Sequence, residues 1–390
     1  MAKYFKCFTD KNPLSYSLGE EIAFTVFARE DGKNINCDLV EWTLEGDDGE
    51  KIKGIATITE SEPLIVTYSL KRAGFVHLNC VALEKNGEKT VDFEPLDASA
   101  GADVLNLRYS DTLPEDFYEY WSQIENIVSE TEIEVLEFNE ISDDVPEGFK
   151  AYDVKIKTPE GRPASGCVTM PCGDKKYPIR VKFMGYGIHG AFCEYHDDTL
   201  FAMFNAHGFE NDKTDAELEE IYGEELSQYG FSKEENAYNT KTYFRNMIIR
   251  DLVGLKYLKT LPEWNKKEIL SIGGSQGALQ AVTVAVYDKD VTELIALKPW
   301  FCDLNSVNHG YMKGWRPEYA EGLRYFDTVA QAMQVKCPTT IECYLGDTCC
   351  PPKTVMAMYN SLKCEKKIKF IQSARHSYFP PENEEVETIF

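Results

Sequence analysis

The sequence predicts an α/β domain built on a mostly parallel β-sheet with helices on both faces, preceded by an all-β sandwich. Three observations carry this prediction. Strand-like and helical segments alternate from about residue 107 onward, the first hundred residues hold only short strand-like runs and turns, and a glycine-rich turn joins a strand to a helix at Ser275. Because 390 residues exceed what one core usually supports, we expect two domains, 1–105 and 106–390.

Short strand-like runs fill the first of these domains. Apolar and polar residues alternate in 22–26 and 40–44, and residues 64–70 and 75–83 are rich in Val, Ile and aromatic side chains. Turn dipeptides punctuate the runs: Asp31-Gly32, Asp48-Gly49 and Asn86-Gly87. The pattern predicts an antiparallel, immunoglobulin-like sandwich. It contains no catalytic constellation, so a packing or positioning role is favoured over sugar binding.

The second predicted domain begins with a helix after Pro114, in which Phe117, Trp121, Ile124 and Val128 fall at helical spacing. Strands are expected at residues 152–157, 166–170, 179–184, 269–272, 294–297, 340–345 and 368–371, and a second helix at 246–261. Residues 212–239, rich in Glu, Tyr and Asn, interrupt the alternation. We interpret them as an excursion whose acidic run is a solvated helix face.

Composition narrows the classes of function. The 65 acidic and 41 basic residues give a formal charge of −24, which argues against nucleic acid and anionic membranes as partners. No apolar run is long enough to span a bilayer or to serve as a signal-peptide core. The 12 cysteines lack zinc-ligand spacing and predict mostly buried, reduced thiols. We therefore expect a cytoplasmic protein, although a signal peptide already removed would leave the same pattern.

The strongest chemical signal is the sequence Gly273-Gly274-Ser275-Gln276-Gly277. It lies between a predicted strand at 268–272 and a helix of small residues at 278–286. A nucleophile on a sharp strand-to-helix turn needs glycines beside it, because the backbone is strained and neighbouring elements approach closely. The sequence therefore predicts Ser275 as a nucleophile on an α/β-hydrolase fold. The alternative is an ordinary glycine-rich turn with a capping serine.

A serine nucleophile requires a general base and a carboxylate that orients the base. In this fold the acid and the histidine follow the serine in chain order, each after a later strand. Asp347 follows the predicted strand 340–345, and His376 follows 368–371. We predict a Ser275, Asp347, His376 triad. Structural roles are expected for the other histidines, at positions 77, 189, 196, 207 and 309.

The developing oxyanion needs two preorganised N–H donors. We predict the backbone N–H of Gln276, at the helix start, and that of Tyr186, in the loop after the strand at 179–184. Tyr186 and Trp300 are also expected at the pocket mouth as substrate contacts, because each follows a predicted strand. The alternative for Trp300 is simple filling of the core.

Two pairs of cysteines invite a metal or redox interpretation. Cys349 and Cys350 lie close to Asp347, but adjacent cysteines without a histidine cluster or C-x-x-C spacing favour structural burial. Cys167 and Cys172 are no more convincing as ligands. We predict no metal at the site.

These residues together resemble the acetyl xylan esterase and cephalosporin C deacetylase family, carbohydrate esterase family seven, over residues 107–390. The resemblance rests on Pro114-Glu115-Asp116-Phe117, Trp121, Gly185-Tyr186-Gly187, Gly274-Ser275-Gln276-Gly277, Asp347, Pro351-Pro352 and His376. It implies removal of acetyl groups from the sugar hydroxyls of acetyl xylan or other acetylated oligosaccharides without a cofactor, and leaves a homo-oligomer open. Two positions depart from the pattern: His207 lies where members carry Arg-Gly-Gln, and Ser377 replaces a glutamate.

Two other functions remain open at this stage. The first is another hydrolase activity on the same fold, such as a peptidase or a thioesterase, because the same triad serves all of them. The second is a sugar-binding protein without catalysis, against which an intact triad argues.

Overall fold

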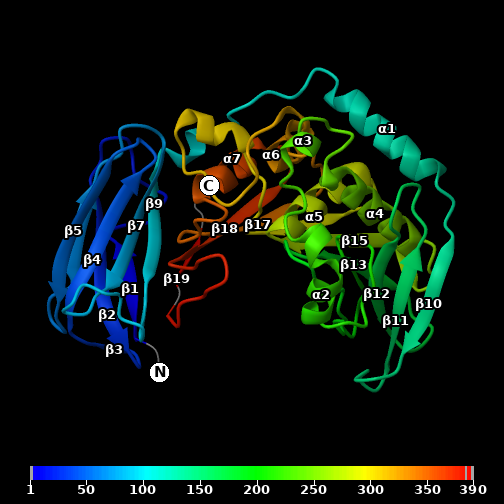
Figure 1. The fold of residues 1–390 in the computed structure, drawn as a ribbon, viewed down its shortest axis with the longest axis horizontal. Coiled ribbons are helices and arrows are strands. Elements are labelled where there is room, and N and C mark those ends of the chain that lie inside the picture. Colours follow the sequence, from blue (N-terminus) through cyan, green and yellow to red (C-terminus); the bar gives the residue numbers. More distant parts are fainter. Residues whose placement is uncertain (1–2, 383, 388–390) are drawn as a thin grey trace.

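The computed structural model describes residues 3–382 and 384–387, and it contains three β-sheets (Figure 1). Two smaller sheets lie in the first hundred residues, and one large sheet takes up the rest of the chain. In Figure 1 the two smaller sheets, coloured blue to cyan, stand at one end of the large sheet. The predicted order, an all-β region followed by an α/β region, is confirmed.

Two sheets pack face to face in the N-terminal region, and all their pairings are antiparallel except the short parallel pairing of β1 with β8. Their orders are β3-β2-β1-β8, with β6 on β2, and β5-β4-β7-β9. The strands are β1 (Lys3–Thr9), β2 (Ile22–Glu30), β3 (Lys33–Asn34), β4 (Cys37–Gly46), β5 (Lys51–Ile58), β6 (Leu64–Tyr68), β7 (Gly74–Ala82), β8 (Phe93–Glu94) and β9 (Leu96–Ala102). Alternate residues such as Phe24, Val40 and Leu78 are fully buried between the sheets. The immunoglobulin-like relationship and the boundary at 105/106 stay predictions.

A ten-stranded mixed sheet forms the larger part of the molecule, in the order β10-β11-β12-β14-β13-β15-β16-β17-β18-β19. All pairings from β14 to β18 are parallel, and antiparallel strands extend the sheet on both sides. The strands are β10 (Val135–Ile141), β11 (Phe149–Ile156), β12 (Ala164–Pro171), β13 (Tyr177–Phe183), β14 (Leu200–Phe204), β15 (Trp264–Gly274), β16 (Glu293–Leu297), β17 (Thr339–Tyr344), β18 (Lys366–Gln372) and β19 (Glu384–Glu387). The predicted parallel sheet is confirmed at its centre.

Helices connect these strands, as expected for parallel neighbours. They are η1 (Val104–Asn106), α1 (Phe117–Glu130), α2 (Asp215–Leu226), α3 (Lys233–Asn236), α4 (Tyr243–Leu258), α5 (Gln276–Tyr287), η2 (Leu304–His309), η3 (Glu321–Tyr325), α6 (Thr328–Ala332) and α7 (Pro352–Ser361). Helix α1 buries Phe117, Trp121 and Ile124 as predicted. Helix α4 begins three residues before its predicted start.

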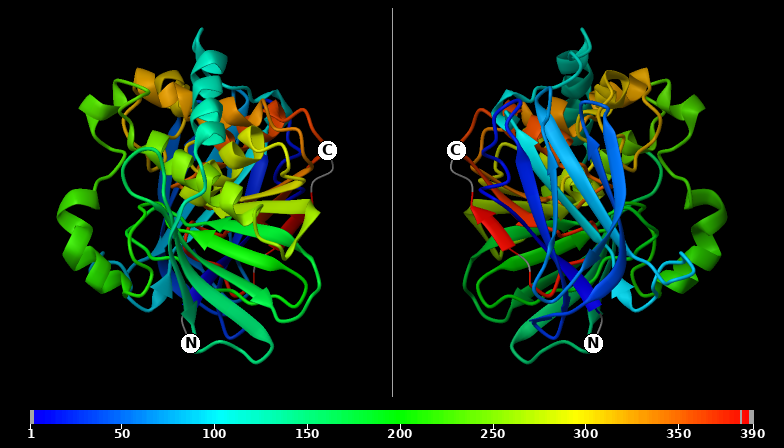
Figure 2. Two further views of the ribbon diagram at one scale, coloured as in Figure 1. Left: turned by 90° about the vertical axis from the view of Figure 1, so that its right-hand side faces the viewer. Right: turned by 90° about the vertical axis from the view of Figure 1, so that its left-hand side faces the viewer.

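The predicted excursion over residues 212–239 leaves the sheet. It contains α2, which begins with a capping box: the side chains of Thr214 and Glu217 each accept a hydrogen bond from the other residue's backbone N–H. The acidic face of α2 is solvated, while Leu218 and Leu226 are buried. Figure 2 shows this green helix projecting from one side of the molecule in both views. The excursion returns to the body of the protein at Tyr229, which is 5% exposed.

The sandwich packs against loops at the β18 end of the large sheet. The side-chain amide of Gln372 donates to the carbonyl of Ser99 in β9 (3.2 Å), and Arg375 forms an ion pair with Glu94 in β8. These contacts fix both ends of the short loop that leads to His376. The N-terminal region thus supports the segment that carries the predicted base.

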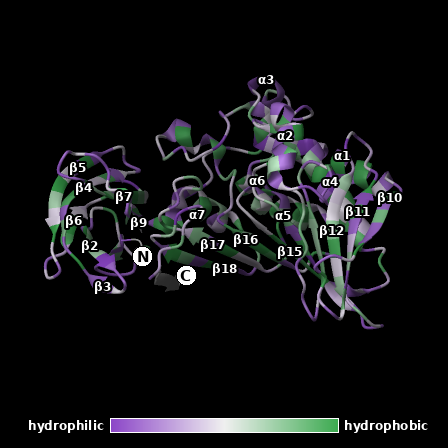
Figure 3. Cartoon of the chain, turned by 60° about the horizontal axis from the view of Figure 1, so that its bottom comes forward, coloured by the Kyte–Doolittle hydropathy of each residue, from purple (hydrophilic) through white to green (hydrophobic). Residues whose placement is uncertain are grey.

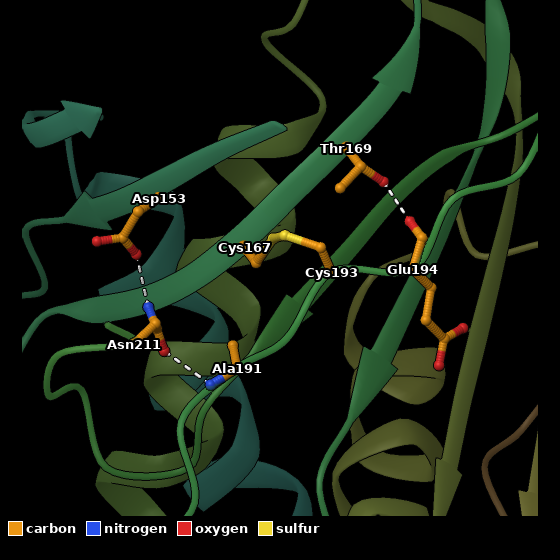
Figure 4. Close-up of a disulfide and its surroundings, with 7 residues drawn as sticks. All are labelled: Asp153, Cys167, Thr169, Ala191, Cys193, Glu194 and Asn211. Atoms are coloured by element: carbon orange, nitrogen blue, oxygen red, sulfur yellow. Dashed lines mark hydrogen bonds between the residues drawn. A yellow bond between two sulfur atoms is a disulfide. The ribbon is translucent and has the colours of Figure 1, made fainter. Parts of the chain in front are cut away.

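One pair of cysteines is oxidised, contrary to the sequence-based expectation of reduced thiols. Cys167 in β12 forms a disulfide with Cys193 in the loop after β13 (Figure 4). Beside it, the hydroxyl of Thr169 donates to the carbonyl of Glu194 (2.5 Å). The loop containing Tyr186 is therefore fastened to the sheet. The cysteines are 26 residues apart and meet only because this loop folds back.

The remaining cysteines carry free thiols in the part of the chain that the structure describes. Six are buried, namely Cys7, Cys37, Cys80, Cys302, Cys343 and Cys350. Cys172 is exposed, and Cys337, Cys349 and Cys364 are partly exposed. The expectation of mostly buried thiols therefore holds for the cysteines outside the disulfide. Structural burial was the wrong expectation for Cys349, which is partly exposed.

Hydrophobic residues, green in Figure 3, follow the central strands of the large sheet. Polar residues predominate on α3 and on much of α2. Among the described helices, none has the length and apolar character required to cross a bilayer.

Candidate active site

Ser275 lies on a sharp turn between β15 and α5. Its backbone has φ 56° and ψ −123°, a conformation that residues other than glycine rarely adopt. A Cβ atom at Gly273 would collide with the carbonyl of Gly277, and one at Gly277 would collide with the carbonyl of Phe183. Both flanking glycines are thus required by close backbone approach. The turn leaves the Ser275 side chain at the carboxyl end of the sheet.

The structure brings the three predicted triad residues together. The Oγ atom of Ser275 lies 3.0 Å from Nε2 of His376, and Nδ1 of His376 lies 2.7 Å from Oδ2 of Asp347. Since a carboxylate only accepts hydrogen bonds, Nδ1 donates to Asp347, and in the neutral form of His376 Nε2 presents its lone pair to Ser275. This tautomer is the one that general-base catalysis at Ser275 requires.

Asp347 is buried and makes hydrogen bonds through both carboxylate oxygens. Its Oδ1 accepts from the backbone N–H groups of Cys349 (2.7 Å) and Cys350 (2.9 Å), while Oδ2 accepts from His376. The backbone N–H of Gly346 donates to the carbonyl of Ala374 (2.9 Å), which links the acid loop to the histidine loop. The carboxylate is therefore fixed in position before substrate binds.

The surroundings of His376 favour its charged form. Burial disfavours the imidazolium, but hydrogen bonds with Asp347 and with the thiol of Cys349 outweigh burial and raise the pKa of His376 to about 9. The neighbouring Cys350 thiol and His376 together lower the pKa of Cys349 to about 6, against the opposing effect of its own burial. The thiol beside the predicted base is thus more acidic than an ordinary cysteine thiol.

A pocket of about 480 Å³ opens over Ser275 and His376. Its walls include Tyr186, Trp315 and Cys349. Trp300, predicted as a substrate contact, lies instead in the core with 1% of its surface exposed. Its indole N–H donates to the carbonyl of Trp315 (2.5 Å), so it supports a ring that lines the pocket. Neither Trp315 nor Cys349 was predicted at the site.

The predicted oxyanion donors both lie near Ser275: Gln276 follows it in the chain, and Tyr186 lines the same pocket. Gln276 is the first residue of α5, where backbone N–H groups have no partner within the helix. Tyr186 lies in the pocket wall. Its ring stacks on that of Tyr229, with 4.1 Å between centroids, and its hydroxyl donates to the Tyr229 carbonyl (3.0 Å).

Tyr229 connects the two predicted donor segments. Its hydroxyl donates to the side-chain oxygen of Gln276 (2.9 Å) and accepts from the backbone N–H of Gly187 (3.2 Å). One buried hydroxyl therefore holds both Gln276 and the loop of Tyr186. Sequence reasoning missed Tyr229, because nothing in the polar excursion distinguishes this tyrosine from its neighbours.

A second buried histidine supports the same loop. Nε2 of His207 lies 2.8 Å from the carbonyl of Gly187, and Nδ1 lies 2.6 Å from the hydroxyl of Tyr243. A carbonyl only accepts, so Nε2 donates and Nδ1 accepts from Tyr243. Burial lowers the pKa of His207 to about 4, and the cation of Arg250 acts in the same direction. His207 is thus a neutral support, in line with its predicted structural role.

One group of potential metal ligands occurs in the described part of the chain. The ligand atoms of Cys349, Cys350 and His376 all lie within 4.8 Å of one another. The predicted reaction uses His376 as a base and requires no ion. A cation bound by these three residues is therefore not needed for the reaction of the triad.

The sheet order, together with the serine on its strand-to-helix turn, defines an α/β-hydrolase fold. The profile of the acetyl xylan esterase (AXE1) family matches residues 102–321 and 313–390. This chain belongs to that family. The acetyl esterase Axe7A of Xylanibacter ruminicola is 25% identical over 271 residues, which are 65% of this chain and 61% of that protein. The chain thus spans about three fifths of that relative.

Two solved structures share the fold. The acetyl xylan esterase from Paenibacillus sp. R4 has a TM-score of 0.59 at 19% identity, covering 71% of this chain and 94% of that chain. Acetyl xylan esterase 1 from Thermoanaerobacterium sp. JW/SL YS485 gives 0.58 at 19% identity, covering 71% and 93%. At this identity the likeness concerns the fold alone.

Proposed function

We propose that this protein is a serine esterase that removes acetyl groups from carbohydrate esters through an acyl-enzyme on Ser275. The observation that carries the proposal is the continuous line of hydrogen bonds from Ser275 through His376 to Asp347 at the floor of a pocket. Family membership and the name of the Xylanibacter relative support the acetyl group.

In the first half of the reaction, Oγ of Ser275 attacks the acetyl carbonyl carbon while Nε2 of His376 takes the hydroxyl proton. The resulting oxyanion accepts hydrogen bonds from the backbone N–H groups of Tyr186 and Gln276. Collapse of the tetrahedral intermediate breaks the bond to the sugar oxygen, and His376 returns the proton to that oxygen. The sugar then leaves as an alcohol.

In the second half, a water molecule attacks the acetyl group on Ser275 and gives its proton to His376. The second tetrahedral intermediate uses the same two N–H donors. Its collapse releases acetate, and His376 returns the proton to Ser275. Asp347 stabilises the imidazolium in both halves and remains a carboxylate throughout.

The pocket walls support a small acyl group. Tyr186 is fixed between the Tyr229 ring and Trp315, whose centroids lie 4.1 and 4.7 Å from its own. Fixed rings leave room for a methyl group, and forcing extra methylenes into a tight site costs about 1–3 kcal/mol. We therefore expect kcat/KM to fall from aryl acetate to butyrate to octanoate. A roomy apolar pocket predicts the opposite trend, because each accepted methylene improves binding.

The function itself is tested with acetylated xylo-oligosaccharides, aryl acetates and peptide amides assayed in parallel. Release of acetate from the oligosaccharides supports the proposal. Preferential cleavage of the amides would replace it with a peptidase, and absence of turnover on the whole panel would favour a binding protein.

Domain division, assembly and location complete the proposal. We assign residues 1–105 to a supporting domain and 106–390 to the catalytic one. Light scattering measures whether the protein forms a homo-oligomer.

Ten free cysteines favour the predicted cytoplasmic location, whereas the Cys167–Cys193 disulfide is typical of oxidising compartments. Thiol alkylation in intact cells, followed by mass spectrometry, decides whether this bond exists in the cell.

A further inference from the structure

We propose that Cys349, Cys350 and His376 form an inhibitory site for a thiophilic divalent cation such as Zn²⁺. Nothing in the esterase reaction uses the two thiols, yet both lie beside the base. The inhibitory consequence rests on the proposed function, whereas cation binding itself does not.

The arrangement of ligand atoms fits a zinc ion. Two sulfur atoms and one imidazole nitrogen lie within 4.8 Å of one another. Zinc bonds of about 2.3 Å to sulfur and about 2.0 Å to nitrogen place such atoms roughly 3.5–3.8 Å apart. The three groups therefore need to approach one another by about an ångström at most. The pocket, about 480 Å³ in volume and lined by Cys349, leaves the fourth tetrahedral position open.

The backbone already orients the two cysteines. Oδ1 of Asp347 accepts the N–H groups of both Cys349 and Cys350, which fixes the turn that carries them. Cys349 lines the pocket and is partly exposed, so a cation from solvent can reach its sulfur.

A cation bound at this site stops catalysis at either nitrogen of His376. Coordination at Nε2 takes the lone pair that accepts the proton of Ser275, and leaves Nδ1–H on Asp347 as an outer-shell hydrogen bond. Coordination at Nδ1 breaks the bond to Asp347 instead. In both cases the general base is lost, and a chelator restores it.

The first experiment titrates aryl acetate hydrolysis with buffered free Zn²⁺ after treatment with a chelator. We expect reversible inhibition of the wild type by one cation per chain, and no inhibition by Mg²⁺, which prefers oxygen ligands. Cys349→Ser and Cys350→Ala should each raise the half-inhibitory concentration at least about tenfold, each relative to its own metal-free rate. The matched control, Cys172→Ser, removes an exposed thiol elsewhere and should be inhibited like the wild type.

The second experiment separates the site from the esterase activity. Co²⁺ is added to the Ser275→Ala variant, which keeps all three ligands, and thiolate-to-cobalt charge-transfer absorption is recorded. We expect a band at one equivalent that is lost when Cys349→Ser is added to this variant. A wild type that resists Zn²⁺, cysteine variants that remain as sensitive as the wild type, or an absent cobalt band would each overturn the site. The cobalt result stands even if the protein hydrolyses none of the esters tested.

Discussion

His376 and His207 both hydrogen-bond to parts of the candidate active site, but their surroundings favour opposite protonation states. His376 lies between the carboxylate of Asp347 and the thiol of Cys349, and its pKa is raised to about 9. His207 is fully buried between a carbonyl and a tyrosine hydroxyl, and its pKa is lowered to about 4. The difference teaches that the partner at each ring nitrogen decides whether a histidine transfers protons or only supports a loop.

The largest expected effect comes from removing the base. We expect His376→Ala to lower kcat by about 10⁶-fold, as in triads whose members act as a unit. His207→Ala removes only the support of Gly187 and should cost far less. Steady-state kinetics on an aryl acetate measure both, and a reversed order would show that the roles of the two histidines were assigned the wrong way round.

The next largest effect concerns the carboxylate that distinguishes His376 from His207. In Asp347→Asn the amide no longer favours the Nδ1–H tautomer, and we expect kcat to fall by about 10⁴-fold. More activity should remain than in the His376 variant, since Asp347 orients and stabilises without transferring protons. If kcat of this variant stayed near the wild-type value, Asp347 would not be the third member of the triad.

Tyr229→Phe tests the neutral network that contains His207. The variant keeps the ring stacked on Tyr186 but leaves Gln276 and Gly187 without their shared hydroxyl. Because small misplacements of catalytic groups are costly, we expect kcat to fall roughly 10- to 100-fold while KM changes little. The control is Tyr222→Phe, because the hydroxyl of Tyr222, in α2 of the excursion, donates to the carboxylate of Glu210. Equal effects of the two substitutions would remove the positioning role of Tyr229.

The smallest effect is a shift in pH dependence. His376 accepts the serine proton only when neutral, so kcat/KM should rise with pH through its pKa. Cys349→Ser removes a negative neighbour and should move this rise about one unit toward lower pH, with chelator present throughout. Asp347 still faces the ring, and Lys298 still contacts the His376 carbonyl. His207→Gln should leave the rise in place, and an alkaline shift in Cys349→Ser would contradict the assigned effect of the Cys349 thiol on the pKa of His376.

The central fold could be predicted because its strands carry strong local signals. Strands β13 and β15 to β18 each contain closely spaced aliphatic or aromatic residues and alternate with helical segments, as expected for a parallel sheet covered by helices. Strand β14 was missed because its sequence, Leu-Phe-Ala-Met-Phe, suits a buried helix as well as a strand. The outer strand β10 was also missed, and most of its residues are exposed, including apolar ones such as Leu136 and Phe138.

The triad positions could be predicted because the fold fixes their chain order and their place after successive strands. The rest of the site depends on tertiary contacts that leave no local pattern. Tyr229 reaches Gln276 and Trp315 reaches the pocket from irregular segments, and Cys349 is distinguished only by the imidazole that folds against it. Trp300 was expected at the pocket because it follows β16, but its neighbour Phe301, at φ 65°, turns the chain into the core.

Labelling with an aryl phosphonate tests the central claim most directly, because the probe reports the attacking atom itself. Peptide mapping of the labelled protein by mass spectrometry should place one adduct on Ser275. The adduct should vanish in Ser275→Ala, together with about 10⁶-fold of kcat, and should form slowly in His376→Ala. An adduct on Cys349, or undiminished labelling and turnover in Ser275→Ala, would contradict the account.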